Sequence, residues 1–146
     1  MKVTFEHDFA RSEFDWIGVD TAGVLGYFST AGAGPIPVTI ATDAALFDSL
    51  PEDVLALVRR GQAIQHQARS WDVTEWLEVA RRGLFAYDWD IAKRRYDLVA
   101  RPSSPLSLDD VGHDRIRRIG SLVVFAARFA DVTSFAAADD VLRAAS

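Results

Sequence analysis

Two short runs near the start of the chain alternate apolar residues with polar or small ones. Residues 14–20 and 24–30 are separated by a three-residue connection that ends in Gly23, a residue that tolerates a positive φ. We expect the two runs to form a β-hairpin over about residues 14–30. Two glycines and two prolines within residues 31–37 then favour a fixed loop over a helix.

Apolar side chains at helical spacing follow this loop. Ser49 is placed to cap a helix, with Glu52 three residues later, and the apolar spacing continues to Ile64. Gly61 lies within this stretch as a stop or a weak point. The pattern predicts helix over about residues 43–66.

The clearest helix of the chain is predicted over residues 72–82. Asp72 and Glu75 have the spacing of a capping box, and Trp71 and Trp76 occupy the two positions of a hydrophobic staple. Apolar positions within this range fall on one face of a helix, so that face is expected to be buried.

The last third of the chain favours strands. Residues 84–90 and 95–101 alternate in the manner of half-buried strands, and residues 121–133 fit a period of two. Residues 136–145 have helical propensity and predict a C-terminal helix. The expected fold is a single α+β domain over residues 1–146, with a largely antiparallel sheet.

Composition restricts the chemistry that this domain can perform. The chain has 146 residues, of which 49% are hydrophobic, enough for one buried core, and it contains no cysteine. Disulfides, thiolate catalysis and cysteine-based metal sites are therefore excluded. The longest apolar run, residues 122–127, is far shorter than the roughly 20 residues of a membrane span. Residues 1–6 show no secretory signal, which favours a cytoplasmic location.

Charge argues against nucleic acid as the partner. The formal net charge is −5, whereas nucleic-acid binders neutralise phosphates with basic residues. Residues 1–20 carry two basic and five acidic side chains, a local charge of −3, while residues 81–118 carry nine basic and six acidic ones. An acidic N-terminal region would attract a basic protein partner.

Recognised catalytic and cofactor motifs are absent from the sequence. The three histidines, His7, His66 and His113, have no metal-binding spacing, and no serine lies in a nucleophile elbow. The glycine-rich segment 31–37 lacks the Gly-Lys-Ser/Thr of a phosphate loop. We expect no metal ion and no cofactor.

Two pairs of acids are the strongest candidates for chemistry. Glu13 and Asp15, and likewise Asp88 and Asp90, stand two residues apart in predicted strands and so share a face. Such pairs can serve acid/base catalysis or hold a divalent ion. The same alternation is also typical of the solvated face of a half-buried strand.

Several segments resemble a family of small bacterial proteins. They are the hairpin sequence Asp15-Trp16-Ile17-Gly18-Val19-Asp20, the stretch Gly26 to Gly32, the segment Gly34-Pro35-Ile36-Pro37, and the later segments 83–88 and 96–102. Together they cover about half the chain and are similar to immunity proteins of polymorphic or contact-dependent toxin systems. The resemblance implies a non-catalytic cytoplasmic protein that neutralises a cognate toxin, such as a basic nuclease, by stoichiometric binding and occlusion.

Three functions follow from these observations. The first is an immunity protein whose partner-binding residues are acidic and aromatic: Glu6, Asp8, Glu13, Asp15, Trp16, Asp20, Tyr27, Asp88 and Asp90. The second is a small enzyme or divalent-metal protein in which the two acid pairs converge in one cleft. The third is a ligand-binding or assembly module with an exposed patch of Trp16, Tyr27 and Trp89.

Overall fold

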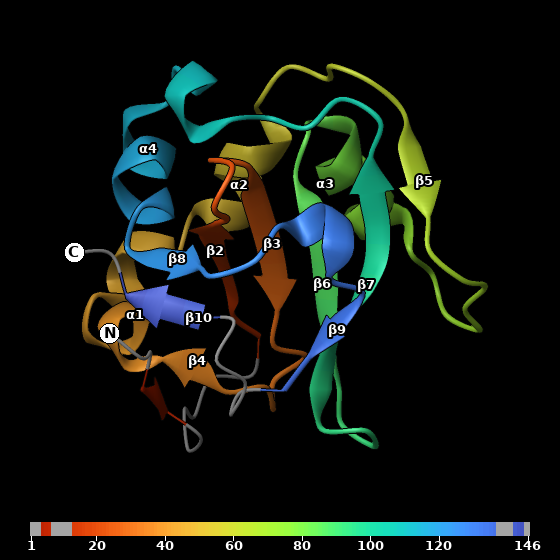
Figure 1. Cartoon of the computed structure of the whole chain (residues 1–146), viewed down its shortest axis with the longest axis horizontal. Coiled ribbons are helices and arrows are strands. Elements are labelled where there is room, and N and C mark those ends of the chain that lie inside the picture. The colour runs from red at the N-terminus through yellow and green to blue at the C-terminus, as the bar shows by residue number, and fades with distance from the viewer. Residues whose placement is uncertain (1–3, 7–12, 137–141, 145–146) are drawn as a thin grey trace.

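A mixed β-sheet forms the centre of the molecule (Figure 1). The computed structural model describes residues 4–6, 13–136 and 142–144. The strands of the large sheet are β2 (Asp15–Val19), β3 (Leu25–Ser29), β5 (Ala63–Gln65), β6 (Phe85–Asp90), β7 (Arg95–Pro102), β8 (Val123–Phe125), β9 (Ser134–Phe135) and β10 (Leu142–Ala144). Their order is β10-β8-β2-β3-β6-β7-β5, with β9 also paired to β7. A separate two-stranded sheet joins β1 (Phe5–Glu6) to β4 (Ile36–Pro37).

The expected α+β class and the predominance of antiparallel pairing are confirmed. The hairpin predicted over residues 14–30 is β2 and β3, which pair from Asp15 with Ser29 to Val19 with Leu25. The strands predicted over residues 84–90 and 95–101 are β6 and β7, also antiparallel. Two pairings, β2 with β8 and β3 with β6, are parallel. Segments distant in sequence therefore lie beside the hairpin.

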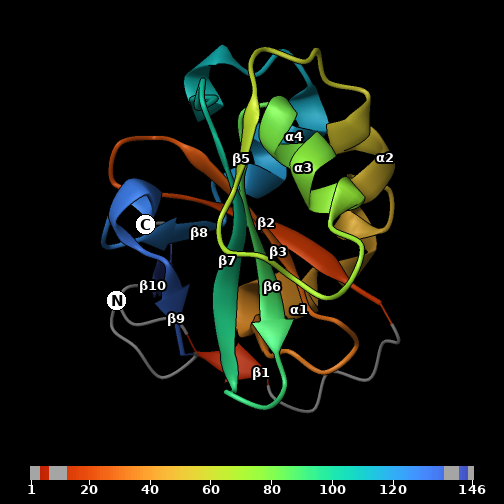
Figure 2. The same ribbon diagram turned by 90° about the vertical axis from the view of Figure 1, so that its right-hand side faces the viewer.

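Helices cover one side of the sheet. They are α1 (Val38–Thr42), α2 (Leu50–Leu55), α3 (Thr74–Arg81) and α4 (Asp114–Gly120), with the short 3-10 helices η1 (Ala44–Phe47) and η2 (Leu108–Asp110). A third 3-10 helix, η3 (Phe129–Asp131), lies on the other side, where Phe129 packs against Phe28 and Phe125. Figure 2 shows α2, α3 and α4 on one side of the sheet and β9 on the other. Within the described ranges, every helix is too short or too polar to cross a bilayer.

The sheet face toward these helices, here called the helix face, is apolar under α4. Ile17 and Leu25 are fully buried, and both lie near Gly120 of α4, where an added Cβ would come within 3.2 Å of Leu25. Leu50 and Val54 of α2 are also fully buried. Burial of such side chains supplies roughly 1.5–3 kcal/mol each, so this layer anchors the helices to the hairpin.

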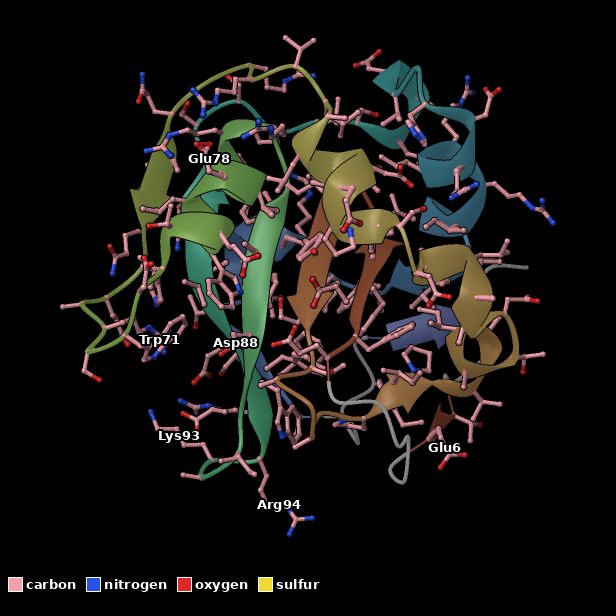
Figure 3. The ribbon with its side chains drawn as sticks, turned by 180° about the vertical axis from the view of Figure 1, so that it is seen from behind. Glu6, Trp71, Glu78, Asp88, Lys93 and Arg94 are labelled. Atoms are coloured by element: carbon pink, nitrogen blue, oxygen red, sulfur yellow. The ribbon has the colours of Figure 1, made fainter. Side chains whose placement is uncertain are left out.

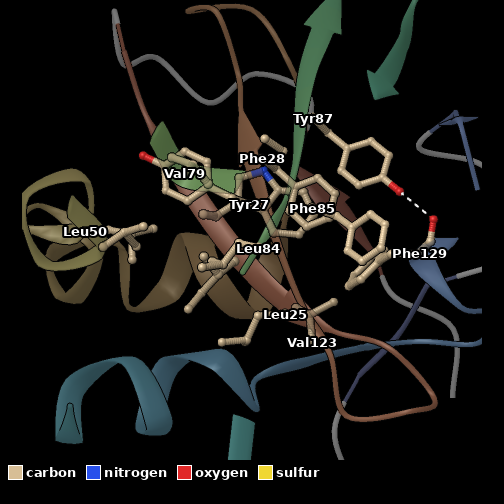
Figure 4. Packing of buried hydrophobic residues seen from close by; sticks show 14 of the residues in the cluster. Leu25, Tyr27, Phe28, Leu50, Val79, Leu84, Phe85, Tyr87, Val123 and Phe129 are labelled. Atoms are coloured by element: carbon tan, nitrogen blue, oxygen red, sulfur yellow. Dashed lines mark hydrogen bonds between the residues drawn. The ribbon is translucent and has the colours of Figure 1, made fainter. Parts of the chain in front are cut away.

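The opposite face, here called the aromatic face, is covered by the C-terminal third of the chain. Phe28 stacks on Trp16 and Tyr87, with ring centroids 4.2 and 5.1 Å apart. The Tyr87 hydroxyl donates to the Val132 carbonyl at 2.6 Å. Phe125, Phe129 and Phe135 complete the cluster, part of which is drawn in Figure 4.

The helix predicted over residues 43–66 is wrong in its second half. Helical structure there is confined to η1 and α2 and ends at Leu55, and Ala63–Gln65 form β5 on the edge of the sheet. The apolar spacing was misleading because Val58 is 84% exposed and Ile64 is 50% exposed. At Gly61, a Cβ would lie 2.7 Å from the Ser103 hydroxyl, so glycine permits the close approach to the end of β7.

The helix predicted over residues 72–82 is confirmed as α3, but its capping box does not form. Asp72 accepts hydrogen bonds from the Thr74 amide and hydroxyl, and Val73 is the N-cap residue without a side-chain cap. The two staple tryptophans do meet, edge to face, with centroids 4.8 Å apart.

Predictions for the C-terminal region are only partly correct. Strand structure within residues 121–133 is limited to β8, since η3 interrupts it before β9 begins at Ser134. Residues 137–141 and 145 of the expected C-terminal helix lie outside the described residues, and Leu142–Ala144 form β10 beside β8 instead. Pairing with an available strand edge thus overrides helical propensity at residues 142–144.

Candidate functional site

An open cleft lies where the helices leave the end of the helix face uncovered. Its volume is about 450 Å³, within the range of ligand-binding clefts. Six carboxylates line it: Glu13, Asp15, Asp48, Glu52, Glu75 and Asp88. The remaining lining residues are Phe14, Ser29, Ala31, Phe47, Pro51, Trp71 and Trp76. None of the described residues that line it is basic, and we call this hollow the acidic cleft.

The floor of the acidic cleft is a row across three neighbouring strands. Asp15 of β2 pairs with Ser29 of β3, and Ser29 is in register with Asp88 of β6. Residues in register share a face, so all three side chains belong to the helix face. With strands about 4.8 Å apart, the Cα atoms of Asp15 and Asp88 are separated by roughly 10 Å.

The rim of the cleft comes from the starts of two helices and from the segment before β2. Glu52 and Glu75 lie in the first turns of α2 and α3, where a negative charge interacts favourably with the helix dipole. Glu13, Asp48, Glu52 and Glu75 are exposed, whereas Asp15 and Asp88 are half-buried. The rim is therefore hydrated and the floor is partly shielded from water.

Burial raises the pKa of both floor carboxyls. The pKa of Asp15 rises to about 6, chiefly through burial, although hydrogen bonds from Tyr27 and Ser29 act in the opposite direction. The pKa of Asp88 rises to about 7, again mainly through burial, and the Asp15 charge raises it further while Arg69 lowers it. Protons are thus exchanged at the floor close to neutral pH.

A tyrosine on the same face of the sheet holds one of the floor carboxylates. The Tyr27 hydroxyl donates to a carboxylate oxygen of Asp15. Burial and the neighbouring Asp15 charge together raise the pKa of Tyr27 well above its usual value, which keeps the phenol protonated as the donor. Asp15 is thereby fixed in orientation while it faces the cleft.

Three of the cleft carboxylates differ from Glu78 in their surroundings. Within the described part of the chain, no ion pair involves Asp15, Glu75 or Asp88. Glu78, one turn further along α3, contacts three arginines at 2.6, 2.8 and 3.2 Å: Arg59, Arg82 and Arg81. The charge of Glu78 is therefore compensated within the protein, whereas Asp15, Glu75 and Asp88 have no such compensation among the described residues.

Tryptophans supply an apolar wall beside these charges. Trp71 is 38% exposed at the cleft and rests edge to face against Trp76. The Arg69 guanidinium lies 5.8 Å from the Trp71 ring centroid, which fixes one face of this indole. A ligand in the cleft would meet carboxylates on the floor and indole rings at the side.

The structure brings together three of the four paired acids. Glu13, Asp15 and Asp88 line the same cleft, and the Tyr27 hydroxyl donates a hydrogen bond to Asp15. Asp90 lies elsewhere: its carboxylate accepts from the Ala92 and Lys93 amides in the turn after β6, both at 3.0 Å. These backbone hydrogen bonds, that of Lys93 first, lower the pKa of Asp90 and give it a structural role.

The other predicted partner-binding residues lie outside the cleft. Trp16 is fully buried on the aromatic face, and Asp20 is 4% exposed and accepts from the Phe129 amide at 2.9 Å, so neither can meet a partner as expected. Glu6 in β1 lies well apart from Asp88 (Figure 3). Asp8 is outside the described residues.

The expected exposed aromatic patch does not exist. Trp16 and Tyr27 are 0% and 4% exposed, and Trp89 packs edge to face on Tyr96 with centroids 5.0 Å apart. The aromatic residue that is exposed at a cavity is Trp71, which the sequence pattern assigned to a helix staple.

Sequence reasoning missed half of the cleft carboxylates. Asp48, Glu52 and Glu75 come from the helical region, where first-turn acids are explained by capping alone. The sequence does contain a signal, since acids lie near the predicted starts of two helices and also in two predicted strands. Only the fold shows that these acids meet in one cleft.

Known proteins give no further guide to this site. Comparison of the chain with protein-family models, curated proteins and solved structures finds no match. Among the described residues, no group of three or more His, Cys, Asp or Glu side chains is arranged to hold a metal ion. The chemistry of the acidic cleft therefore has to be argued from its own geometry.

Proposed function

We propose that the chain is a non-catalytic binding protein whose acidic cleft receives a cationic group from a basic protein partner. One observation carries the proposal: six carboxylates line a single cleft of about 450 Å³, and none of the described residues in its lining is basic. Because like charges there repel one another, a cation entering the cleft relieves repulsion as well as forming new contacts.

The partner class comes from the resemblance to immunity proteins. A toxin that cleaves nucleic acid needs a basic surface for phosphate, and a concentrated negative surface would compete for it. Such a protein acts in the cytoplasm as a stoichiometric inhibitor, occluding the toxin surface without chemistry. The exposed rim carboxylates, Glu52 and Glu75 among them, would steer association, and the half-buried floor would receive the side chain that enters.

Co-expression tests this function. The chain is produced with the toxin domain encoded directly upstream of its gene, and cell survival and a purified 1:1 complex are measured. We expect protection by the native chain and its loss in the variant Glu13→Gln/Glu52→Gln/Glu75→Gln, which removes three rim charges. The matched control is Asp109→Asn/Asp110→Asn/Asp131→Asn, which removes three charges outside the cleft lining. Absence of a complex with the native chain, or equal loss in both variants, would contradict the proposal.

A catalytic use of the floor is the second candidate, favoured by the pKa values of about 6 for Asp15 and about 7 for Asp88. Two carboxyls near neutrality can act as acid and base. The two functions differ in stoichiometry. An inhibitor protects only when present at one copy or more per toxin, whereas an enzyme would inactivate many toxin molecules per copy and would lose this activity in Asp88→Asn.

A further inference from the structure

A second hollow lies on the outer edge of β7. Two strands share this edge: β5 pairs with residues 100–102 of β7, and β9 pairs with residues 96–97 (Figure 1). The open hollow beside Leu98 has a volume of about 50 Å³, and we call it the edge notch. Its lining residues, polar apart from Leu98, are His66, Gln67, Arg69, Arg95, Asp97, Leu98, Thr133 and Ser134. Among the described residues, it shares none of its lining with the acidic cleft.

Arg69 is held in the edge notch by two contacts. One of its Nη groups donates a hydrogen bond to the Leu98 carbonyl at 2.9 Å. Its guanidinium also lies 5.8 Å from the ring centroid of Trp71. The guanidinium is therefore fixed in orientation before a ligand arrives, which reduces the entropy lost on binding.

The Nε–H group of Arg69 is buried and has no hydrogen-bond partner among the described residues. Arg69 also forms no ion pair with a described carboxylate. Leaving a buried donor without an acceptor is costly, and more so when the donor is charged. Native proteins satisfy nearly all such donors with a protein atom, a water molecule or an ion. An anion would satisfy the Nε–H group and the charge of Arg69 together.

Other donors line the edge notch on its remaining sides. Among the described residues, Arg95 contacts Asp97 through its Nε at 2.7 Å, which leaves its two Nη groups as donors. The hydroxyls of Thr133 and Ser134 come from the β9 side, and the His66 ring comes from the residue after β5. The charge of Asp97, the one carboxylate in the described lining, is offset by Arg95. The second arginine of the lining therefore leaves the notch positive.

This set of donors favours a phosphate group over a carboxylate. A carboxylate presents two coplanar oxygens, whereas a phosphate presents acceptor oxygens in several directions. Donors that belong to separate segments of the chain can thus be used together by a phosphate. Arginine is also well suited to phosphate, because its planar fork can donate two parallel hydrogen bonds to it.

We infer that the edge notch binds a phosphate group, as the free ion or as a small phosphate monoester, with Arg69 as its main partner. The edge notch is a separate site, and this inference does not depend on the function proposed for the acidic cleft.

Inorganic phosphate, methyl phosphate and sodium chloride are the probes, added to the full ¹⁵N-labelled chain at about pH 8 and at equal ionic strength. The side-chain Nε–H of Arg69 and the backbone amide of Leu98 are followed by NMR. With phosphate we expect both signals to shift saturably, the Arg69 Hε downfield because it gains an acceptor. Saturation by methyl phosphate as well would extend the site to monoesters, and saturation by inorganic phosphate alone would assign it to the free ion. Shifts that do not saturate, or equal shifts with chloride, would overturn the inference.

Three variants locate the bound phosphate. Arg69→Gln removes the charge and should weaken phosphate binding by about tenfold or more. Ser134→Ala leaves Arg69 and the backbone pairing of β9 intact and should weaken binding about threefold, so it tests the notch even if Arg69→Gln disturbs the local fold. The control Arg117→Gln removes an exposed arginine outside the described notch lining and should leave the affinity unchanged. Equal losses in Arg69→Gln and Arg117→Gln would mean that net charge, and not the notch, holds the anion.

The ionisation of Asp88 gives a second measure of where the anion lies. Burial raises the pKa of Asp88 to about 7, and the Arg69 charge opposes this rise. A phosphate on Arg69 offsets that charge, while the charges of Asp15 and Asp90, which raise the same pKa, stay as they are. Saturating phosphate should therefore raise the pKa of Asp88 further, which a ¹³C NMR titration of its carboxyl measures. A pKa that does not rise would contradict contact between the anion and Arg69.

Discussion

Two neighbouring rows of the sheet, one residue apart along the strands, have opposite characters. On the aromatic face, Phe28 is stacked between Trp16 and Tyr87, and all three are fully buried. On the helix face, Ser29 lies between Asp15 and Asp88, and all three are only half-buried at the cleft. The same three strands, β2, β3 and β6, supply both rows.

The difference shows how a small domain divides stability and binding between the faces of one sheet. Successive side chains on a strand point to opposite faces of the sheet. The aromatic row and the cleft floor are therefore adjacent positions of the same strands, separated only by the backbone. Close packing of the first row holds the strands in register. The row at the cleft floor can then contain half-buried carboxyls whose ionisation opposes folding, because the strand register does not depend on them.

Removing the central ring should produce the largest effect. Phe28→Ala deletes a fully buried side chain that stacks on two others, and we expect it to lower the free energy of unfolding by about 3–5 kcal/mol. Ser29→Ala, the neighbouring position in the cleft row, should change it by no more than about 1 kcal/mol. Urea denaturation of both variants measures the contrast, and equal losses would show that the rows do not divide these roles.

Neutralising the floor should instead stabilise the protein. Asp15→Asn keeps the shape and the acceptor for Tyr27 while removing a charge that burial disfavours. The rise of the Asp15 pKa from 3.8 to about 6 corresponds to at most about 3 kcal/mol above pH 6, so we expect a gain of about 1–3 kcal/mol at pH 8. Asp90→Asn is the control: the folded-state pKa of this residue is lowered, so its ionised form favours folding and its neutralisation should not stabilise. A loss of stability in Asp15→Asn would mean that the charge supports the fold.

The same pKa values set a pH dependence with a defined sign. Asp15 and Asp88 bind protons more tightly in the folded state than in the unfolded state. Their ionisation therefore lowers the free energy of unfolding at pH 8. This loss is recovered as the pH falls through about 7, where Asp88 takes up its proton, and about 6, where Asp15 does. We expect the free energy of unfolding to rise from about pH 8 to about pH 5, and the slope to flatten in Asp15→Asn/Asp88→Asn. Affinity for a cationic group in the acidic cleft should change in the opposite direction, since the cation needs ionised carboxylates on the floor.

The sequence predicted the strands better than the helices for a physical reason. In residues 14–30 and 84–101, the alternation of apolar and polar residues directly indicates strands with one buried face. These segments contain β2, β3, β6 and β7. Residues 63–65 became strand because an edge of β7 was available, a fact that no local pattern contains. The alanine-rich C-terminus was predicted from propensity, which tertiary pairing overrides at β10.

The site could likewise be predicted only where a local pattern in the sequence reports it. Spacing placed Glu13 with Asp15 on one face, and the parallel pairing of β3 with β6 added Asp88. Asp90 has the same spacing from Asp88, yet it accepts the amides of the following turn instead. Glu52 and Glu75 reach the cleft only because two separate helices begin beside it.

The smallest change in stability should come from the rim, and it isolates binding from folding. Glu75→Gln alters an exposed side chain without an ion pair in the described part of the chain, so the free energy of unfolding should change by no more than about 0.5 kcal/mol. Affinity for the basic partner should nevertheless fall, because one exposed carboxylate of the acidic cleft is lost. Glu78→Gln, the same substitution one turn along α3, removes contacts to three arginines and should lower stability more while leaving that affinity intact. If both variants weakened partner binding equally, the affinity would reflect the net charge of the protein rather than the geometry of the acidic cleft.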